Sequence, residues 1–436
     1  MSNTAGMTRV VVVGAGVIGS AIALELQQSG YEVVVLERGA TPGCGSTSAS
    51  SAIIRYTYST RDAILMAWES ALRWRVWGDF LGAGAVAPLA RLVDCPNLTF
   101  VTPGFDATTV MSWWDEFGID HELLDADELS ERYPALDLGR YFPPRLADDP
   151  EFGRDAEGAL SGLVCGPAGF VDDPGLSAVN LADAARWHGA EFRFRAEVVG
   201  VERSGGRVAG VVLADGERVL ADVVVNAAGP HSSGVNRLAG VTDDMTISHR
   251  ALRQEVFSVP APVGVGLVDG GAFVADLDLG QYFRPHLGGT MIVGGTEAEC
   301  DGLHWVDDPD AASDHPTVAV WETAMLRLAR RVPGFGVPTA PTGLAALYDV
   351  TDDWVPIYDR SSLDGYFMAC GTSGNQFKNA PMVGLVMRSI IDAVLAGHDH
   401  DNDPVRVVGP STGAQIDTGS FSRRRVPAVT TGTVLG

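Results

Sequence analysis

The chain has 436 residues, which suits two or three domains; 46% of them are hydrophobic and 52 are glycine. This composition is typical of a well-packed α/β protein with many tight turns. The formal net charge is −24, and no basic cluster interrupts the acidic chain before residues 423–425. Because such a field repels nucleic acid and anionic membrane surfaces, we expect neither as a partner.

The sequence shows neither a targeting segment nor a disulfide framework. The first nine residues lack the basic start and apolar core of a signal peptide, and no uninterrupted apolar stretch reaches the about 18 residues of a membrane span. The cysteines are odd in number and scattered, with no CxxC pair: Cys44, Cys95, Cys165, Cys300 and Cys370. We therefore expect a reduced, cytoplasmic enzyme.

Residues 9–38 have the pattern of a βαβ unit. A short apolar run over 9–13 predicts a strand of a parallel sheet. Apolar residues at helical spacing over 18–26, with Gly30 as the C-cap, predict a helix, and 31–36 predicts the second strand.

Further elements follow along the chain. Helices are predicted at 61–80, 176–188, 318–331 and 380–395, and strands at 191–202, 208–213, 219–226 and 365–369, with a hairpin turn at 215–216. Alternating apolar and polar residues from 250 to 297 indicate an antiparallel sheet. The polar segment beyond Gly397 is expected to lie draped over the surface or to be partly mobile.

A glycine-rich motif sits between the first strand and the first helix. Gly14 permits the tight turn, Gly16 lets the backbone approach a pyrophosphate, and Gly19 packs the helix on the strand. Glu37, 18 residues past Gly19 at the end of the second strand, can accept hydrogen bonds from ribose hydroxyls. The motif with this full context predicts a dinucleotide site at the helix N-terminus.

Two later segments favour FAD over NAD. The strand within 219–226 ends in small residues, about where flavoproteins with two dinucleotide folds return to cover the adenosine half. The strand at 365–369 enters a turn at Gly371 and Gly374 and then a helix. The N-terminus of that helix can stabilise the negative charge that collects on the flavin pyrimidine ring on reduction.

Four segments together resemble a known family, the sarcosine oxidase and dimethylglycine dehydrogenase group of the D-amino-acid oxidase-like (DAO) flavoproteins. The segments are 14–19, 45–58, 348–357 and 371–378. The resemblance spans roughly residues 8 to 397 and is closest, in the Ile-Ile-Arg segment, to the β subunit of heterotetrameric sarcosine oxidases.

The resemblance implies that Arg55 and Lys378 bind the carboxylate of the substrate. It also implies that Tyr348 and, by a looser alignment, Tyr282 lie around the substrate. Chemistry agrees, since an amino-acid carboxylate needs paired cations to offset its desolvation, and Lys378 is the only lysine in the chain. A loop-bracing arginine and a packed core tyrosine are the alternatives for Arg55 and Tyr282. His231, His249, His286 and His304 are candidate bases, none with metal-ligand spacing to another.

The motifs and the resemblance also imply a set of FAD-contacting residues. They lie in the nucleotide motif, at the end of the second strand, in the Gly-Ser-Thr loop, and in the two later segments. The residues are Gly14, Gly16, Val17, Ile18, Gly19, Glu37, Arg38, Gly45, Ser46, Thr47, Val198, Ala228, Gly229, Gly371, Gly374, Asn375, Gln376, Phe377 and Lys378.

Several positions depart from the family pattern. The flavin-linking cysteine corresponds to Ala346 and the flavin-linking histidine to about Ala49, so we expect non-covalent FAD, with Cys44 an outside candidate for attachment. The lysine that activates oxygen in monomeric sarcosine oxidases falls near Ile292. Because the chain has no second lysine, oxygen and another electron acceptor both stay open.

The predicted fold is α/β, with a Rossmann-like FAD-binding domain of the DAO (glutathione-reductase-2-like) type interleaved with a substrate domain on a mixed or antiparallel sheet. We assign 1–80, 156–240 and 340–400 to the FAD-binding domain, 81–155 and 241–339 to the substrate domain, and 401–436 to a C-terminal tail.

The expected reaction is oxidation of a C–N bond in a small, sarcosine-like amino acid or amine, by hydride transfer to flavin N5. The imine then hydrolyses. Two alternatives stay open: a dehydrogenase with a protein or quinone electron acceptor, and a flavin-carrying partner subunit of a larger complex.

Overall fold

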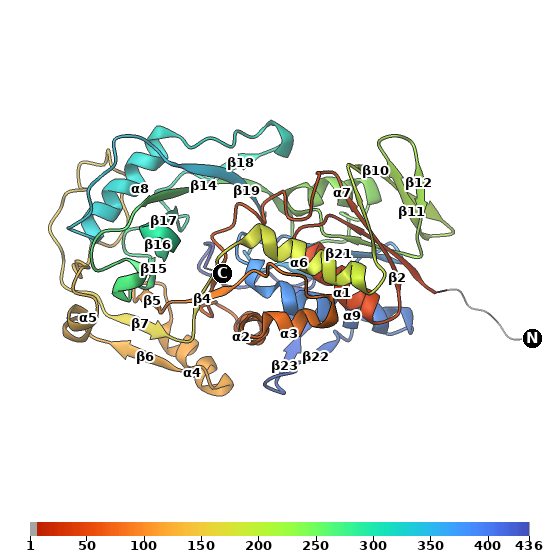
Figure 1. Cartoon of the computed structure of the whole chain (residues 1–436), viewed down its shortest axis with the longest axis horizontal. Coiled ribbons are helices and arrows are strands. Elements are labelled where there is room, and N and C mark those ends of the chain that lie inside the picture. The colour runs from red at the N-terminus through yellow and green to blue at the C-terminus, as the bar shows by residue number, and fades with distance from the viewer. Residues whose placement is uncertain (1–6, 436) are drawn as a thin grey trace, which may run out of the picture.

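The computed structural model describes residues 7–435 and builds two large sheets side by side (Figure 1). The first residues of the N-terminal segment that we interpreted as lacking a signal peptide lie outside this range. Among the described residues, no helix is both long and apolar enough to cross a membrane.

A six-stranded sheet forms the right half of the molecule in Figure 1. Its strand order is β20-β21-β13-β1-β2-β9, parallel except for β20, which runs antiparallel to β21. The strands are β1 (Arg9–Val13), β2 (Glu32–Glu37), β9 (Glu191–Phe194), β13 (Val223–Asn226), β20 (Ile357–Arg360) and β21 (Tyr366–Cys370).

Both faces of this sheet are covered, which explains the unbroken apolar runs in its strands. Val10 and Val12 face a core shared with helices α1 (Val17–Gln28), α6 (Pro174–Trp187) and α9 (Ala380–Leu395). Val11 and Val13 face the opposite way, toward a small sheet of β10 (Val198–Ser204), β11 (Arg207–Leu213) and β12 (Arg218–Leu220) and toward α7 (Ser232–Ala239).

A nine-stranded, mainly antiparallel sheet forms the left half. Its order is β18-β14-β17-β16-β15-β5-β7-β6, with β19 also paired to β14. The strands are β5 (Asn97–Phe100), β6 (His121–Leu124), β7 (Gly162–Cys165), β14 (His249–Pro260), β15 (Phe273–Asp276), β16 (Gln281–His286), β17 (Thr290–Gly295), β18 (His304–Val306) and β19 (Gly343–Thr351).

The remaining elements pack around these sheets. The helices are α2 (Arg61–Arg75), α3 (Trp77–Leu81), α4 (Ala107–Phe117), α5 (Ala126–Arg132) and α8 (Val318–Arg331). The short strands are β3 (Ile53–Ile54), β4 (Leu92–Asp94), β8 (Gly169–Val171), β22 (Arg406–Val408) and β23 (Gln415–Asp417). Because β7 and β19 pair within the nine-stranded sheet, the predicted boundaries at residues 156 and 340 would cut through it.

Three stretches that we predicted as single elements each form two separate elements in the structure. The stretch 191–202 divides because Arg195 takes a φ of 54°, a left-handed conformation that ends β9 and redirects the chain into β10. The stretch 219–226 divides into β12 and β13, which belong to different sheets. The helix predicted over 61–80 breaks at Val76, where the backbone leaves the helical region (φ −116°, ψ 40°).

We expected the segment beyond Gly397 to lie draped over the surface or to be partly mobile. This expectation is wrong for Arg423 and for the last described residues, which are buried. Arg423 is 1% exposed and forms ion pairs with Asp244 (2.6 Å), Asp359 (3.0 Å) and Asp401 (2.7 Å). Further along the chain, the final described residues, Val434 and Leu435, are buried in an apolar cluster. A guanidinium surrounded by three carboxylates fixes the tail at Arg423.

Candidate active site

The glycine motif forms a tight turn at the carboxyl end of the central strands β1 and β13 of the six-stranded sheet. Gly14 has a φ of 103°, and a Cβ built on it would lie 2.5 Å from the carbonyl oxygen of Ala227. A Cβ on Gly19 would clash with the carbonyl of Gly14, so neither position tolerates a side chain. The turn therefore brings the N-terminus of α1 against the carboxyl ends of β1 and β13, where a pyrophosphate group binds in such folds.

Glu37 ends β2 and organises the same turn. Its Oε2 accepts a hydrogen bond from the backbone N–H of Ala15 (2.8 Å), and its Oε1 accepts one from Gly39 (2.7 Å). This orientation places the carboxylate beside the phosphate-binding turn. The neighbouring Arg38 is exposed and pairs with Asp310 (2.6 Å).

Two further predicted segments adjoin this turn. The Oγ of Thr47 accepts a hydrogen bond from the N–H of Val17 (3.1 Å), and the Oγ of Ser46 donates one to the carbonyl of Leu347 (2.7 Å). The loop that follows Gly45 thus links α1 to β19. Val198, Ala228 and the turn at Gly229 lie at or beside the face of the sheet opposite α1.

The second glycine turn follows β21 and is held by Asp349 of β19. The Oδ2 of Asp349 accepts a hydrogen bond from the N–H of Gly371 (2.6 Å), and its backbone carbonyl accepts one from Ser373 (2.7 Å). A Cβ on Gly374 would clash with the ring of Tyr348. The helix α9 spans the predicted range 380–395, and a 3₁₀ turn at Phe377–Asn379 precedes it. Asn375 and Gln376, ahead of it, are buried.

Asp349 also belongs to a buried polar cluster. Its Oδ1 is 2.7 Å from Nδ1 of His249, whose Nε2 lies 3.1 Å from the amide nitrogen of Asn236 and 3.7 Å from Sγ of Cys370. Each ring nitrogen therefore has a partner within the protein. The cluster braces the Gly371 turn, and His249 is not available as a base for a ligand.

Arg55 and Lys378 are both buried, and both contact Tyr58. Nζ of Lys378 donates hydrogen bonds to the Tyr58 hydroxyl (3.0 Å) and to the carbonyl of Asn375 (2.8 Å). The guanidinium of Arg55 stacks over the Tyr58 ring at 4.6 Å. Burial and the nearby Arg55 charge hold the pKa of Lys378 well below its ordinary value. The structure thus brings both predicted cations together.

Neither cation has a carboxylate within ion-pair distance in the part of the chain that the structure describes. Among the described residues, the acceptors for Arg55 are the backbone carbonyls of Thr57, Val434 (2.6 Å) and Leu435 (3.3 Å). Two buried cations without an acid make a site that favours an anionic ligand, because the ligand's charge offsets their desolvation.

The two predicted tyrosines line the same region. Tyr348 and Tyr282 are on β19 and β16, and the Tyr282 hydroxyl is 2.7 Å from Oγ of Ser51. Burial raises the pKa of both phenols, so both stay neutral. His286, also on β16, is 3.0 Å from a guanidinium nitrogen of Arg284 through its Nδ1.

Sequence reasoning missed two contributors to this region. Glu297, just after β17, is buried with a φ of 52° and accepts a hydrogen bond from the N–H of Val434 (2.7 Å). Val434 and Leu435 come from the tail and are buried among the aromatic residues around Arg55. A signal existed only for the tail, since Val434-Leu435 is an apolar pair at the end of a polar segment.

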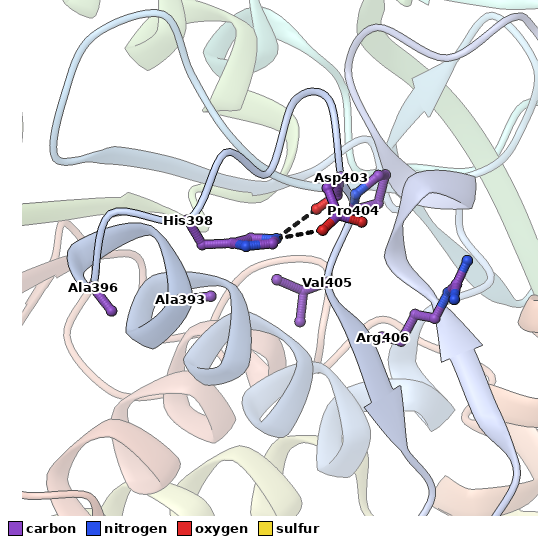
Figure 2. A pocket seen from close by; sticks show the side chains of 7 residues that line it. All are labelled: Ala393, Ala396, His398, Asp403, Pro404, Val405 and Arg406. Carbon is purple, nitrogen blue, oxygen red and sulfur yellow. Dashed lines mark hydrogen bonds and ion pairs between the residues drawn. The ribbon is translucent and has the colours of Figure 1, made fainter.

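A separate surface crevice lies at the end of α9 (Figure 2). His398 points into it and its Nε2 contacts the carbonyl oxygen of Asp403 at 2.6 Å, while Arg406 points away from that contact. Its lining shows no pair of buried charged groups like those around Arg55.

The residues around the two glycine turns fit FAD. Backbone N–H groups at the start of α1 and a carboxylate at the end of β2 suit the diphosphate and a ribose, and close approach at Gly14 leaves no room for a side chain. The Gly371–Gly374 turn ahead of α9 suits the flavin end.

Comparison with known proteins agrees with this fit. The chain is 25% identical over 417 residues to a D-amino acid dehydrogenase of Xanthobacter autotrophicus, covering 84% of this chain and 93% of the relative. Its fold is similar to that of L-proline dehydrogenase from P. horikoshii (TM-score 0.72, 20% identity, 96% and 97% covered). It is also similar to that of glycine oxidase from Geobacillus kaustophilus (TM-score 0.67, 22% identity, 90% and 96% covered).

The family model described as FAD dependent oxidoreductase (DAO) matches residues 9–390, which include both glycine turns, Arg55 and Lys378. The chain therefore belongs to the DAO family and is an FAD-dependent oxidoreductase.

Proposed function

We propose that the protein oxidises the C–N bond of a small amino acid, with the carboxylate of the substrate held between Arg55 and Lys378. The observation that carries this proposal is the pair of buried cations with no acidic partner among the described residues. A carboxylate at this point offsets both charges and can accept a bidentate hydrogen bond from the guanidinium.

The chain's own residues would orient the substrate. FAD, when bound, supplies the two-electron acceptor for the hydride. Arg55 and Lys378 would fix the carboxylate and so restrict the position of the Cα–H bond, while Tyr348 and Tyr282 would line the site. The Gly371–Gly374 turn and α9 would face the flavin end.

The resemblance to the sarcosine oxidase group extends this proposal to N-substituted amino acids. The relatives support amino-acid chemistry more broadly, since those compared are named for D-amino acids, L-proline and glycine. We propose non-covalent FAD as well, because Ala346 and Ala49 stand where the resemblance places the flavin-linking residues.

A second candidate is a dehydrogenase that passes electrons to a protein or quinone instead of oxygen. The single lysine of the chain favours it, because Lys378 is already engaged with Tyr58 and Asn375, and the resemblance places the oxygen-activating lysine near Ile292. The 25% identical relative is also named a dehydrogenase.

The test is anaerobic mixing of the FAD-loaded protein with glycine, sarcosine, proline and D- and L-alanine, followed by admission of air. Loss of the flavin absorbance with at least one amino acid supports the proposal. Return of the colour within seconds indicates an oxidase, whereas a return over many minutes indicates a dehydrogenase. An unbleached flavin with every amino acid would contradict the proposal.

A further inference from the structure

The backbone of Val434 joins two buried groups of opposite chemical character. Its N–H donates to Oε2 of Glu297 at 2.7 Å, and its carbonyl accepts from Nη2 of Arg55 at 2.6 Å. The backbone nitrogen of this one residue therefore contacts a carboxyl group, and its backbone carbonyl contacts a guanidinium. The amine nitrogen and carboxylate of a free α-amino acid are separated by the same two bonds through Cα.

The side chain of Val434 lies in an apolar environment that would also suit the side chain of an apolar amino acid. It is buried in an apolar cluster with residues of the nine-stranded sheet, of β8, of neighbouring loops and of the tail. The cluster includes Phe170, Phe273, Tyr282, Trp354 and Leu435. Tyr348 packs at its edge.

Glu297 lacks a cationic side-chain partner within ion-pair distance among the described residues. Burial raises the pKa of its carboxyl to about 8, and the charge of Arg55 opposes that rise only in part. A left-handed φ of 52° at a non-glycine residue is costly, so the surrounding structure must hold the residue in place. A buried carboxyl that faces Arg55 across one residue of chain is positioned to accept a hydrogen bond from a ligand amine.

We propose that Glu297 binds the amine nitrogen of the substrate while Arg55 binds its carboxylate, and that Val434 occupies this amino-acid subsite until substrate replaces it. The inference rests on the proposed function and narrows it. The substrate is an α-amino acid with at least one N–H donor and an apolar side chain. The end of the tail acts as an internal occupant that the substrate displaces.

Comparison of two ligands that differ only in the amine measures the contribution of the amine to binding. 2-Aminoisobutyrate has no hydrogen on Cα and cannot be oxidised there, and pivalate has a methyl group in place of its amine. Calorimetric titration of the FAD-loaded full chain compares both ligands on the wild type, on Glu297→Gln and on Glu299→Gln. Glu299 lies two residues away and is exposed, so it serves as the matched control.

We expect Glu297→Gln to weaken binding of 2-aminoisobutyrate by at least about tenfold and to leave pivalate unchanged, because only the amine meets the carboxyl group. Glu299→Gln should alter neither affinity. Equal effects on the two ligands, or none, would overturn the inference, as would a wild type that does not distinguish 2-aminoisobutyrate from pivalate.

Flavin bleaching in the same preparations separates this inference from the proposed function. Glu297-dependent binding without bleaching by any amino acid contradicts the function and keeps the amine site. Bleaching with binding that does not depend on Glu297 keeps the function and removes the amine site.

Discussion

The guanidinium of Arg55 donates a 2.6 Å hydrogen bond to the backbone carbonyl of Val434, which lies 379 residues further along the chain. The tail thereby reaches the same cation that we assign to the substrate carboxylate. Leu435 adds a second carbonyl at 3.3 Å. In our proposal, the end of the tail and the substrate therefore compete for Arg55.

Removal of the residues that follow Gly432 should strengthen carboxylate binding. Without Val434 and Leu435, Arg55 loses two backbone acceptors, and a ligand no longer needs to displace them. We expect the Kd for pivalate to fall by about tenfold in calorimetric titration. A weaker affinity, with FAD still bound, would show that the tail builds the site instead of occupying it.

Substitution Lys378→Met should raise the KM for the amino-acid substrate by about 10- to 100-fold, since it removes one charge-assisted contact to the carboxylate. The absorbance spectrum of bound flavin should stay the same, because Nζ is directed at Tyr58 and Asn375. Lys378→Arg, which keeps the charge, should show a smaller increase. An unchanged KM in Lys378→Met would remove Lys378 from the substrate site.

Glu297→Gln should change the pH dependence of stability. Burial raises the pKa of Glu297 to about 8, so between about pH 4.5 and 8 the folded state holds a proton that the unfolded state has released. The contribution of Glu297 to stability is therefore lost as the pH rises through this range, by up to about 1.4 kcal/mol per pH unit.

Denaturant unfolding from pH 5 to 9 checks this prediction. The stability of Glu297→Gln relative to the wild type should increase steadily with pH, whereas Glu299→Gln should follow the wild type. Parallel curves for all three proteins would show that the carboxyl of Glu297 is ionised throughout.

Gly14→Ala should abolish most FAD binding. The added Cβ would lie 2.5 Å from the carbonyl oxygen of Ala227 and would require a strained φ of 103°. Gly153→Ala is the control, because nothing lies within 4 Å of its Cβ and its φ is not positive. Fluorescence titration of apoprotein with FAD should show at least about a tenfold loss of affinity for Gly14→Ala only. Equal affinities would place the dinucleotide elsewhere.

The first βαβ unit and the two glycine turns could be predicted because local physics determines them. A continuous valine run such as Val10–Val13 predicts a strand covered on both faces, and both faces are covered. Positions such as Gly14 and Gly374 admit no side chain, so the pattern of glycines in the sequence predicts where these tight turns lie.

The rest depended on distant contacts that periodicity does not encode. The break at Arg195 follows from a left-handed φ, and the path of the tail follows from three carboxylates that meet Arg423. Glu297 resembles any other acidic residue in an acidic chain, and only its burial opposite Arg55 distinguishes it. No local pattern could have placed Val434 beside it.

The most direct test of the account is anaerobic reduction of the bound flavin by amino acids compared with 2-hydroxy acids of the same carbon skeleton. The pairs are D- and L-alanine with D- and L-lactate, and glycine with glycolate. We expect at least one amino acid to bleach the flavin while its hydroxy acid does not, and Arg55→Met to abolish the difference at equal substrate concentration. Bleaching by a hydroxy acid, or equal bleaching by wild type and Arg55→Met, would contradict a carboxylate-anchored C–N oxidation.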